Sequence, residues 1–479
     1  MSVLDLEEDI TGMNGYKYLL KNIGLLTISQ FATKILSFLL VPLYTNILTT
    51  TEYGTFDLLV STISVLIPIL TLNIQESVIR FLLDKSADEK AIVCISTKYF
   101  TCSNLVIAFL LLVNHVFNVF TIIDQYALYF LLLYFVQSLS GILIAYVRGV
   151  DRVADLSISS IISSAVTITS NILFLVVFRW GLQGYFLASS IGPFAQCVYL
   201  CVRSKFFRKL TLGRYVSDER KMLLYSKPLI ANSVAWWVNS VSDRYVVSFF
   251  CGVAENGIYS ISGKIPQILN VFQTIFNQAW TLSAVKDFDA DDKNGFFTDT
   301  YKMYNCILVI ICSGIIFLDK VLAKLLYAKE FYLAWRYVPW LTIAIIFGAL
   351  SGYIGGFFSA VKDSKIFATS TVLGAVTNIV LNLIFTPLLG AMGAAIATAI
   401  SYIEVWIFRY VKSKRIIRMN INLRRDVFSY LILIVQSIVL LFLDGVFLLI
   451  TECALFIFIL VVYVSEIKRI VEMVIKRKE

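Results

Sequence analysis

The amino-acid sequence predicts an all-α protein embedded in a membrane. Hydrophobic residues make up 58% of its 479 residues and charged residues only 15%, and the mean hydropathy is +0.80. A soluble domain carries about 25% charged residues. The apolar residues come in blocks of about 20, the length at which a helix crosses the hydrocarbon core of a bilayer. The proline content is low, at 7, and strict alternation of apolar and polar residues is absent, which argues against a β-barrel.

These blocks predict about fourteen transmembrane helices, arranged as two six-helix lobes followed by two C-terminal helices. The predicted domains are 1–215 for the first lobe, 216–415 for the second, and 416–479 for helices 13 and 14 with a basic tail. The spans are predicted at 22–44, 55–79, 91–113, 126–147, 157–178, 184–202, 228–250, 256–283, 303–318, 338–360, 366–387, 391–408, 427–443 and 445–464. The chain opens with acidic residues, so we expect no cleaved signal peptide and a first span that is retained.

Basic residues predict the orientation of the chain. With a cytoplasmic N-terminus, 32 of the 41 Lys and Arg residues fall in connections and tails on that side, five fall on the opposite side and four fall inside spans. Short cytoplasmic loops carry an excess of Lys and Arg. We therefore expect a bacterial inner-membrane protein with both termini in the cytoplasm, and we attribute the net charge of +9 to topology rather than to nucleic-acid binding. Four of the five outer charges lie at 320–336, where a helix in the membrane interface would explain them.

Three short motifs recur in the two predicted lobes at nearly constant offset. They are E-x-G-x-aromatic at 52–56 and 255–259, Asn-Ile at 171–172 and 378–379, and G-x-x-G at 181–184 and 390–393. Chance similarity between Gly-rich turns is the alternative, because each match is weak alone. A repeat of six helices has even parity, so the two copies share one orientation and are related by a pseudo-two-fold axis along the membrane normal, as in parallel-repeat transporters.

Polar side chains form stripes on four predicted spans, at 22–44, 55–79, 228–250 and 256–283. Their helical spacing places each stripe on one face, and polar groups in lipid should face other helices or water. The stripes predict a shared central cavity lined by Gln30, Asp57, Gln75, Asn239, Asp243 and Gln267. The last two spans are almost bare of charge, so we expect them to be peripheral.

Three basic residues lie deep within these stripes, namely Lys34, Arg244 and Lys264. A charge at the centre of a membrane helix costs about 2.5–3.5 kcal/mol on insertion scales. A cationic cavity suits an anionic substrate such as a phosphate or an acidic sugar. The alternative is structural pairing, with Asp243 as the counter-ion. Near the inner end of the second span, Glu76 and Arg80 form either an inner gate or side chains that extend to the membrane surface.

Several segments carry a family resemblance. They are Lys34 to Arg80 with Val41-Pro42-Leu43-Tyr44-Thr45, Leu224 to Ile230, Asp243-Arg244, Gly257 to Ser260, Lys264-Ile265-Pro266 and Phe331 to Pro339. Over roughly residues 20–410, the chain resembles the Wzx-type oligosaccharide flippases of the MOP (MATE-like) superfamily. The resemblance implies two six-helix lobes, a V-shaped cavity lined chiefly by helices 1, 2, 7 and 8, and rocking between inward-open and outward-open states.

The resemblance also implies a function. It is the translocation of polyprenyl-diphosphate-linked oligosaccharide units across the cytoplasmic membrane by alternating access, for O-antigen, capsule or exopolysaccharide biosynthesis. On this interpretation the chain is not an enzyme and needs no cofactor or metal. Its expected partners are the lipid-linked substrate and membrane lipids, with polysaccharide polymerase and chain-length machinery as further candidates.

Two alternatives remain open from the sequence. A cation-coupled multidrug exporter of the same superfamily should rely on intramembrane carboxylates, whereas the deep charges here are mostly basic, with Asp243 as the chief exception. A polysaccharide polymerase or glycosyltransferase should carry a large extracytoplasmic loop, whereas the longest outer connection predicted here is about 20 residues, at 319–337.

Overall fold

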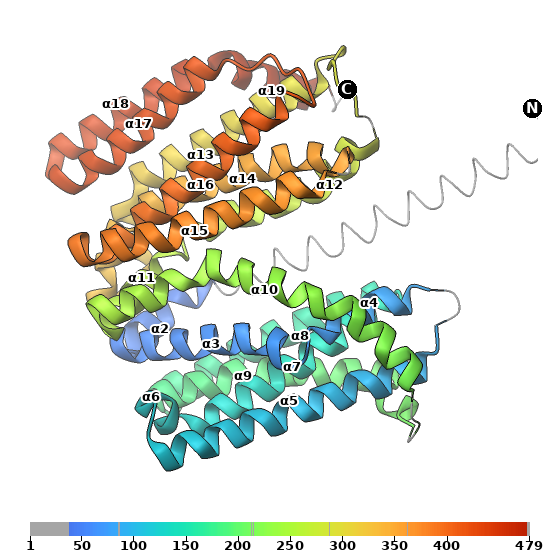
Figure 1. Cartoon of the computed structure of the whole chain (residues 1–479). Helices are drawn as coiled ribbons and strands as arrows, with labels where there is room; N and C mark the ends of the chain where they lie inside the picture. The colour runs from blue at the N-terminus through green and yellow to red at the C-terminus, as the bar shows by residue number, and fades with distance from the viewer. Residues whose placement is uncertain are drawn as a thin grey trace, which may run out of the picture. The chain divides into compact units, whose positions relative to one another are not determined.

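The computed structural model describes residues 38–476, with the exception of 85, 86, 212, 214, 287 and 362. Within this part of the chain every regular element is a helix (Figure 1), as the composition predicts. Eleven of the described helices are long and apolar enough to cross a membrane, so this is a multi-pass membrane protein. The total of about fourteen spans stays a prediction.

The chain divides into two compact units. Unit 1 comprises Met1–Leu48 and Thr55–Trp237, and unit 2 comprises Thr49–Gly54 and Val238–Glu479. Two of the three divisions fall inside a helix, after Gly54 within α3 (Thr50–Leu70) and after Trp237 within α10 (Val216–Cys251), and the third lies between α2 (Val41–Ile47) and α3. The predicted lobe boundary at 215–216 instead coincides with the start of α10.

Unit 1 is built from helices whose apolar faces meet around α7. Its elements are α2 (Val41–Ile47), α3 (Thr50–Leu70), α4 (Ile74–Leu82), α5 (Glu89–Phe117), α6 (Thr121–Gln125), α7 (Ala127–Gly149), α8 (Val153–Asn171), the π-helix η1 (Ile172–Val177), α9 (Gly181–Ser204), the 3-10 helix η2 (Phe206–Lys209) and the first part of α10 (Val216–Cys251). One core cluster includes Val93 of α5, Tyr146 of α7, Leu200 of α9 and Met222 of α10. These contacts join helices from both ends of the unit's sequence.

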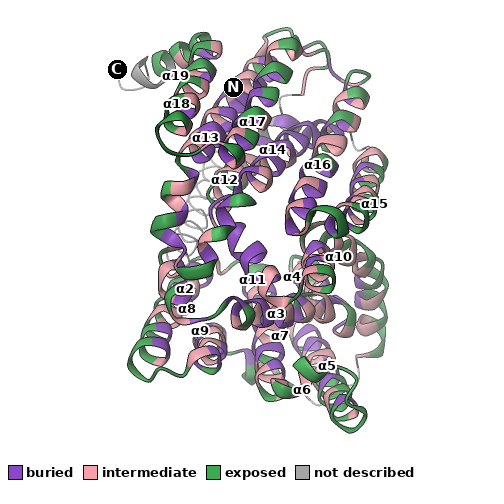
Figure 2. Ribbon diagram, turned by 90° about the vertical axis from the view of Figure 1, so that its left-hand side faces the viewer, coloured by how far each residue is buried: buried purple, intermediate pink, exposed green. Residues whose placement is uncertain are grey.

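Unit 2 is built around α14. Its elements are the rest of α10, α11 (Val253–Ser262), α12 (Gln267–Lys286), α13 (Phe296–Leu326), the 3-10 helix η3 (Lys329–Arg336), α14 (Val338–Ala360), α15 (Ser364–Leu389), α16 (Ala391–Ser413), α17 (Leu423–Phe442), α18 (Gly445–Val462) and α19 (Val464–Lys476). Figure 2 shows buried residues along α14 and exposed residues on α18. In α18 the buried residues are Glu452 and Ile459, so most of this helix faces outward, as expected for a peripheral span.

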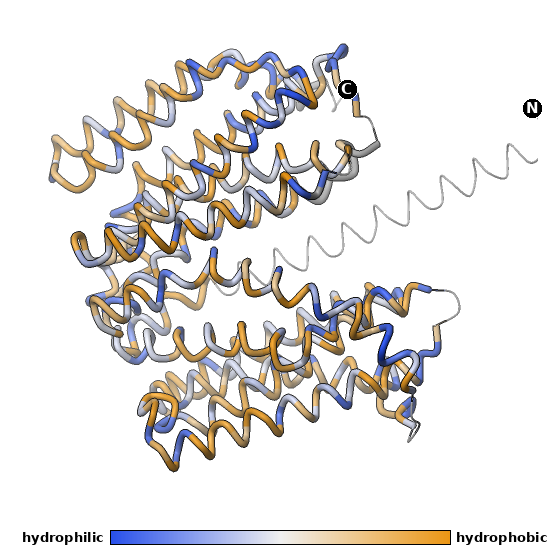
Figure 3. Tube along the Cα trace, in the orientation of Figure 1, coloured by the Kyte–Doolittle hydropathy of each residue, from blue (hydrophilic) through white to orange (hydrophobic). Residues whose placement is uncertain are grey.

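Local sequence signals set the ends of several helices. The carboxylate of Asp88 accepts hydrogen bonds from the backbone N–H groups of Lys90 and Ala91 at the start of α5, and the amide oxygen of Asn422 accepts one from Arg425 at the start of α17. Such N-caps satisfy donors that have no partner inside the helix. Figure 3 shows hydrophobic residues along α5 and the α17–α18 pair, with hydrophilic residues gathered at their ends.

Two predicted spans are interrupted in the structure. The span predicted at 55–79 becomes α3 and α4, separated at residues 71–73, and the span predicted at 256–283 becomes α11 and α12, separated at residues 263–266. At the first break Leu72 and Asn73 take positive φ angles of 54° and 52°, which end a right-handed helix. At the second, the turn ends at Pro266, which disfavours helical backbone at the residue before it.

Two other spans extend beyond their predicted ends. The span predicted to stop at 318 continues through Asp319 to Leu326 in α13, and the span predicted to stop at 408 continues through Arg409 to Ser413 in α16. The hydropathy pattern ends at the first charged residue, but the helix does not. The interfacial helix expected at 320–336 is in part the end of α13 and in part η3.

The two E-x-G-x-aromatic motifs meet inside unit 2. A Cβ atom on Gly54 would lie 2.1 Å from the carbonyl oxygen of Val253, and one on Gly257 would lie 2.0 Å from that of Thr50. The contact is reciprocal, because each glycine faces the residue four positions before the other. A pair of equivalent helices related by a two-fold axis gives this kind of contact.

The two G-x-x-G motifs form the same kind of turn. Gly181 and Gly390 take positive φ angles of 53° and 64° at the starts of α9 and α16. Gly184 and Gly393 then pack against the preceding helix, where added Cβ atoms would lie 3.0 Å from Phe174 and 2.2 Å from Phe385. The recurrence of these glycines in the sequence therefore has a shared structural cause.

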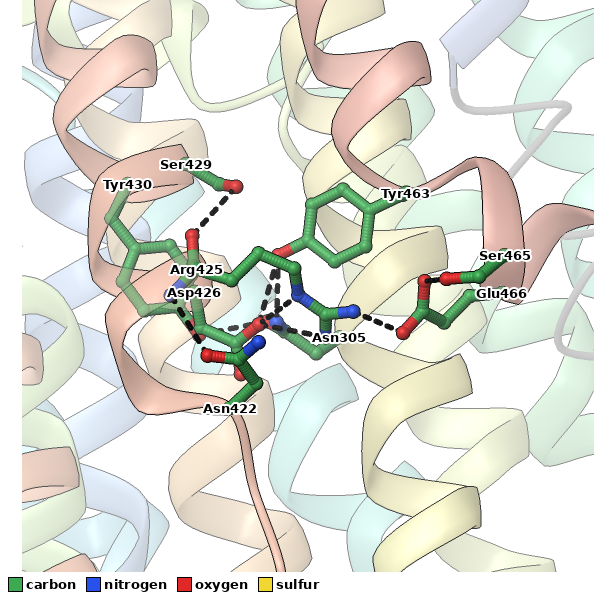
Figure 4. Close-up of polar contacts among 9 residues, drawn as sticks. All are labelled: Asn305, Asn422, Arg425, Asp426, Ser429, Tyr430, Tyr463, Ser465 and Glu466. Atoms are coloured by element: carbon green, nitrogen blue, oxygen red, sulfur yellow. Dashed lines mark hydrogen bonds and ion pairs between the residues drawn. The ribbon is translucent and has the colours of Figure 1, made fainter.

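A buried polar cluster joins α13, α17 and α19 (Figure 4). Asp426 Oδ1 accepts hydrogen bonds from Arg425 Nη2 at 3.0 Å and from the hydroxyl of Tyr463 at 3.2 Å. Arg425 Nη1 also pairs with Glu466. Asn305 of α13 accepts a hydrogen bond from Tyr430 at 2.8 Å and donates one to Tyr463 at 3.0 Å. We call these residues the Arg425 cluster: Asn305, Arg425, Asp426, Tyr430, Tyr463 and Glu466.

Candidate functional site

The predicted cavity residues fall into three groups. Gln30 and Lys34 lie outside the described residues. Asp57, Gln75, Glu76 and Arg80 lie in unit 1, and Asn239, Asp243, Arg244, Lys264 and Gln267 lie in unit 2. The shared cavity and its cationic lining therefore stay predictions, while each unit gives its own local geometry.

In unit 1, the second polar stripe faces α7, α9 and α10. The half-buried Asp57 of α3 lies near Tyr185 of α9. Gln75 of α4 is half-buried, and its Oε1 packs on Gly141 of α7. Gln75 Nε2 donates to Asn73 Oδ1 at 3.5 Å, and Asn73 Nδ2 donates to Ser233 Oγ at 3.2 Å.

The hydrogen bonds from Gln75 through Asn73 to Ser233 connect residues of two predicted spans. It passes through the α3–α4 break and reaches α10. A second contact between the same helices is the hydrogen bond from Trp237 Nε1 to the carbonyl oxygen of Ser61, at 2.9 Å. The polar residues of the second and seventh predicted spans therefore meet within unit 1.

The predicted gate residues lie on the surface of α4. Glu76 is exposed, and Arg80 forms an i,i+4 ion pair with Asp84 at 2.9 Å, with both side chains about half exposed. Exposed pairs of this kind contribute less than about 1 kcal/mol. The inner gate stays a prediction, and Arg80 pairs with Asp84.

In unit 2, the stripe on α10 contacts α11 and α15. Asp243 is 9% exposed, and its Oδ2 accepts a hydrogen bond from the hydroxyl of Tyr259 on α11 at 2.5 Å. Its Oδ1 accepts the backbone N–H of Arg244 at 3.0 Å. Asn239 Nδ2 donates to the carbonyl oxygen of Thr371 on α15 at 3.3 Å. The side chain of Asp243 thus forms a hydrogen bond across helices, from α10 to α11.

Lys264 occupies a helix break rather than a helix. It lies in the turn 263–266 between α11 and α12, and Gln267 is the first residue of α12. Both side chains are half-buried. The prediction of a continuous helix through Lys264 is therefore wrong, since Gly263 and Pro266 interrupt it. Interrupted membrane helices leave backbone groups free to bind, and they commonly line cavities.

Arg409 of α16 is a buried cation that lies just outside the span predicted at 391–408. It is 5% exposed, and its guanidinium donates to Ser370 Oγ at 2.8 Å, to the carbonyl oxygen of Ser351 at 2.9 Å and to Thr371 Oγ1 at 3.1 Å. Its guanidinium carbon also lies 4.2 Å from the ring centre of Phe367. Because Asn239 binds the carbonyl of the same Thr371, Arg409 belongs to the polar surroundings of α10.

Lys98, a cation in another predicted span, forms an ion pair. Lys98 of α5 is about half exposed and pairs with Glu219 at 2.7 Å, outside the predicted stripes. This hydrogen bond, with a second from Tyr99, lowers the pKa of Glu219. Lys98 is therefore a suitable reference cation for experiments on Arg244 and Lys264.

Comparison with known proteins places this geometry in context. Residues 19–284 match the family described as polysaccharide biosynthesis protein. The probable low-salt glycan biosynthesis flippase Agl15 of Haloferax volcanii is 23% identical over 190 residues. This alignment covers 39% of the chain and 40% of that relative, so the chain matches less than half the length of Agl15.

Solved structures share the fold over most of the chain. The lipid II flippase MurJ in an inward closed conformation superimposes with a TM-score of 0.70 at 17% identity, covering 93% of this chain and 98% of that one. An inward-facing multidrug resistance MATE transporter of the MOP superfamily gives 0.66 at 13% identity, covering 81% and 97%. The chain therefore shares its fold with these two proteins.

Proposed function

The chain belongs to the polysaccharide biosynthesis protein family, and we propose that it is a flippase for polyprenyl-diphosphate-linked oligosaccharide units. The observation that carries the proposal is family membership on a fold shared with a flippase for a lipid-linked precursor. The units would serve surface polysaccharide such as O-antigen, capsule or exopolysaccharide. Both termini would lie in the cytoplasm, in keeping with the distribution of Lys and Arg.

The proposed mechanism separates the head group from the tail. The diphosphate and sugars enter a polar cavity and meet Lys34, Arg244 and Lys264, because charge-assisted hydrogen bonds to phosphate are the strong ones. The polyprenyl tail stays in lipid, since taking each CH₂ group into water costs about 0.8 kcal/mol. Rocking of the two lobes then exposes the head group on the outer side. Any ion or potential that drives this cycle must bind or act on the two states unequally.

Unit 2 supplies the local support for this mechanism. The Tyr259–Asp243 hydrogen bond joins α11 to α10 at the residue next to Arg244. Arg409 already donates three hydrogen bonds within unit 2, so we assign it a structural role in holding α14, α15 and α16 together. The substrate would meet Arg244 and Lys264 rather than Arg409.

The test is complementation of a strain that lacks its own flippase. Surface polysaccharide and lipid-linked intermediates are measured for wild type and for Lys34→Ala, Arg244→Ala and Lys264→Ala at matched membrane abundance. We expect wild type to restore display and the three variants to leave lipid-linked units on the cytoplasmic side. Lys98→Ala is the matched control, since it removes a cation outside the stripes. Normal display by all three variants would refute the cationic cavity.

A second candidate is a cation-coupled multidrug exporter, which the likeness to the MATE fold favours. Such a transporter would depend on Asp243, the buried carboxylate of the stripe on α10. The two functions separate in one comparison, because an exporter lowers drug accumulation in cells and loses this activity in Asp243→Asn. Failure of wild type to restore display across several sugar backgrounds, with lowered drug accumulation, would favour the exporter. Polysaccharide polymerase and chain-length machinery remain candidate partners of the flippase.

A further inference from the structure

Two buried carboxyl groups lie between α13, α17 and α18, apart from the predicted cavity residues. Asp319 is 0% exposed and Glu452 is 1% exposed. Each lies seven residues from a helix end, at Leu326 for Asp319 and at Gly445 for Glu452, which is about 10 Å along a helix. The three helices pack on one another, and the two carboxyls are close enough for their charges to interact. We call these two residues the Asp319 pair.

The hydrogen bonds around the Asp319 pair are incomplete. Glu452 Oε2 accepts from Gln436 Nε2 at 3.0 Å, and Gln436 Oε1 accepts from Ser313 Oγ at 2.8 Å. This chain orients the amide of Gln436 as a donor to Glu452. In the part of the chain that the structure describes, no donor reaches Glu452 Oε1 or either oxygen of Asp319. Three buried acceptor oxygens therefore lack a hydrogen.

The nearest cation does not fill this gap. Lys320 follows Asp319 in the chain and is close enough for its charge to act on Asp319, but its Nζ pairs with Asp444 at 2.8 Å and lies 4.6 Å from the ring centre of Trp335. Successive helix residues point about 100° apart, which directs Lys320 away from the Asp319 side. Burial of an unpaired carboxylate is strongly unfavourable, and two like charges in one site are worse.

A proton fits this site better than a metal ion. Oxygen-bound cations such as Ca²⁺ take about 6–8 ligands, whereas the pair offers three unpaired oxygens. The helix faces nearby are aromatic, since Phe317 of α13 and Phe456 of α18 stack with ring centres 5.8 Å apart. A proton removes one charge and turns one acceptor into a donor.

We propose that Asp319 and Glu452 form a proton-binding site that holds at least one proton at neutral pH and fastens α18 to α13 and α17. Glu452 and Ile459 are the buried residues of α18, so the charge of Glu452 affects the main attachment of this helix. A cavity of about 440 Å³ is lined in part by Lys320, Leu441 and Asp444, but not by Asp319 or Glu452. The proposal does not depend on the proposed flippase function.

Other titratable or charged groups surround the site, and their effects must be separated from that of the pair. These groups are Cys312 and Lys320 of α13, Tyr327 directly after α13, Arg336 of η3, Asp444 between α17 and α18, and Cys453 of α18. Substitution of the two carboxyls by their amides leaves all of these groups in place. The amide variants therefore isolate the contribution of the Asp319 pair.

The first test is infrared spectroscopy of the full chain in lipid bilayers at neutral pH. We expect a protonated-carboxyl C=O band in wild type that shifts in D₂O and is lost in Asp319→Asn with Glu452→Gln combined. Glu472→Gln, which changes an exposed carboxylate on α19, should keep the band. A wild-type spectrum without the band, or an unchanged band in the double variant, would overturn the proposal. Loss of the wild-type band on adding sodium would indicate that the pair binds a metal ion in place of the proton, and it would overturn the proposal.

The second test measures the unfolding temperature in detergent as the pH is raised from neutral. Ionisation of both carboxyls would place two buried charges side by side, so wild type should lose stability as pH rises. The double amide variant should lose less over the same range, and this difference is the expected result. Parallel curves for wild type and the double variant would show that the pair does not fasten α18.

Discussion

The two ends of α17 carry polar groups that are stabilised in different ways. Near its start, Arg425 neutralises Asp426 and Glu466, and the tyrosines of the Arg425 cluster add hydrogen bonds (Figure 4). Near its end, Gln436 donates to Glu452, and among the described residues no donor reaches the other three oxygens of the Asp319 pair. Both sites join α13 to the last helices of the chain.

The difference teaches how a buried charge can be tolerated in a membrane protein. Asp426 is 0% exposed, but Arg425 beside it is 16% exposed, so its charged end remains near the surface. At the Asp319 pair the neighbouring Lys320 is directed to Asp444. An opposite charge stabilises the first site, and we infer that a proton stabilises the second.

The largest expected effect is that of Arg425→Ala. The substitution leaves Asp426 and Glu466 without their cation, and breaking a buried pair costs about 3–5 kcal/mol. Unfolding can be followed by dye labelling of Cys306 and Cys312, which are buried in α13. Arg469→Ala is the control, because Arg469 is about half exposed and pairs with Asp299 on the surface, which should cost less than about 1 kcal/mol. Equal effects of the two variants would show that Arg425 stabilises the protein no more than a surface ion pair does.

A smaller loss is expected for Gln436→Leu. Leucine removes the donor to Glu452 Oε2 and the acceptor for Ser313, and each buried group left unpaired costs about 1–3 kcal/mol. The same labelling of Cys312, two turns from Asp319, reports the change. If the double variant Gln436→Leu with Glu452→Gln is no more stable than Gln436→Leu, then the carboxyl charge is not the source of the loss.

Tyr430→Phe tests one hydrogen bond of the Arg425 cluster and leaves its charges intact. Asn305 Oδ1 loses its donor, at an expected cost of about 1–2 kcal/mol, less than Arg425→Ala. Thermal unfolding of both variants under one condition gives the comparison. A loss as large as that of Arg425→Ala would mean that the hydroxyl network, rather than the ion pair, holds this end together.

The smallest effect is expected for Glu452→Gln at neutral pH. Glutamine keeps the acceptor for Gln436 and replaces the other carboxyl oxygen by an uncharged N–H donor, so the unfolding free energy should change by less than about 1 kcal/mol. Unfolding of α13 at neutral pH, followed at Cys306, measures this change. A loss comparable to that of Arg425→Ala would indicate a charged Glu452 with a partner that the amide cannot bind.

Much of the fold could be predicted from the sequence, because the membrane makes strong demands on composition. Apolar blocks of about 20 residues locate most helices, and the predicted span at 338–360 matches α14 at both ends. The recurring glycines also have local causes, since Gly181 and Gly390 adopt positive φ angles at equivalent turns. The polar stripes directed attention to Asn239 and Asp243, which do make contacts across helices.

The tertiary structure alone decided which charges are buried and how they are paired. A hydropathy pattern treats a charged residue as the end of a span, so it excluded Asp319 and Arg409 from helices that continue through them. It also made the last two helices look peripheral, although Glu452 is buried against α13 and α17. Sequence determines how apolar a helix is, because that depends on its own residues. The partner of a buried polar group can lie more than a hundred positions away, as Ser313 and Gln436 do, and such residues meet only after packing.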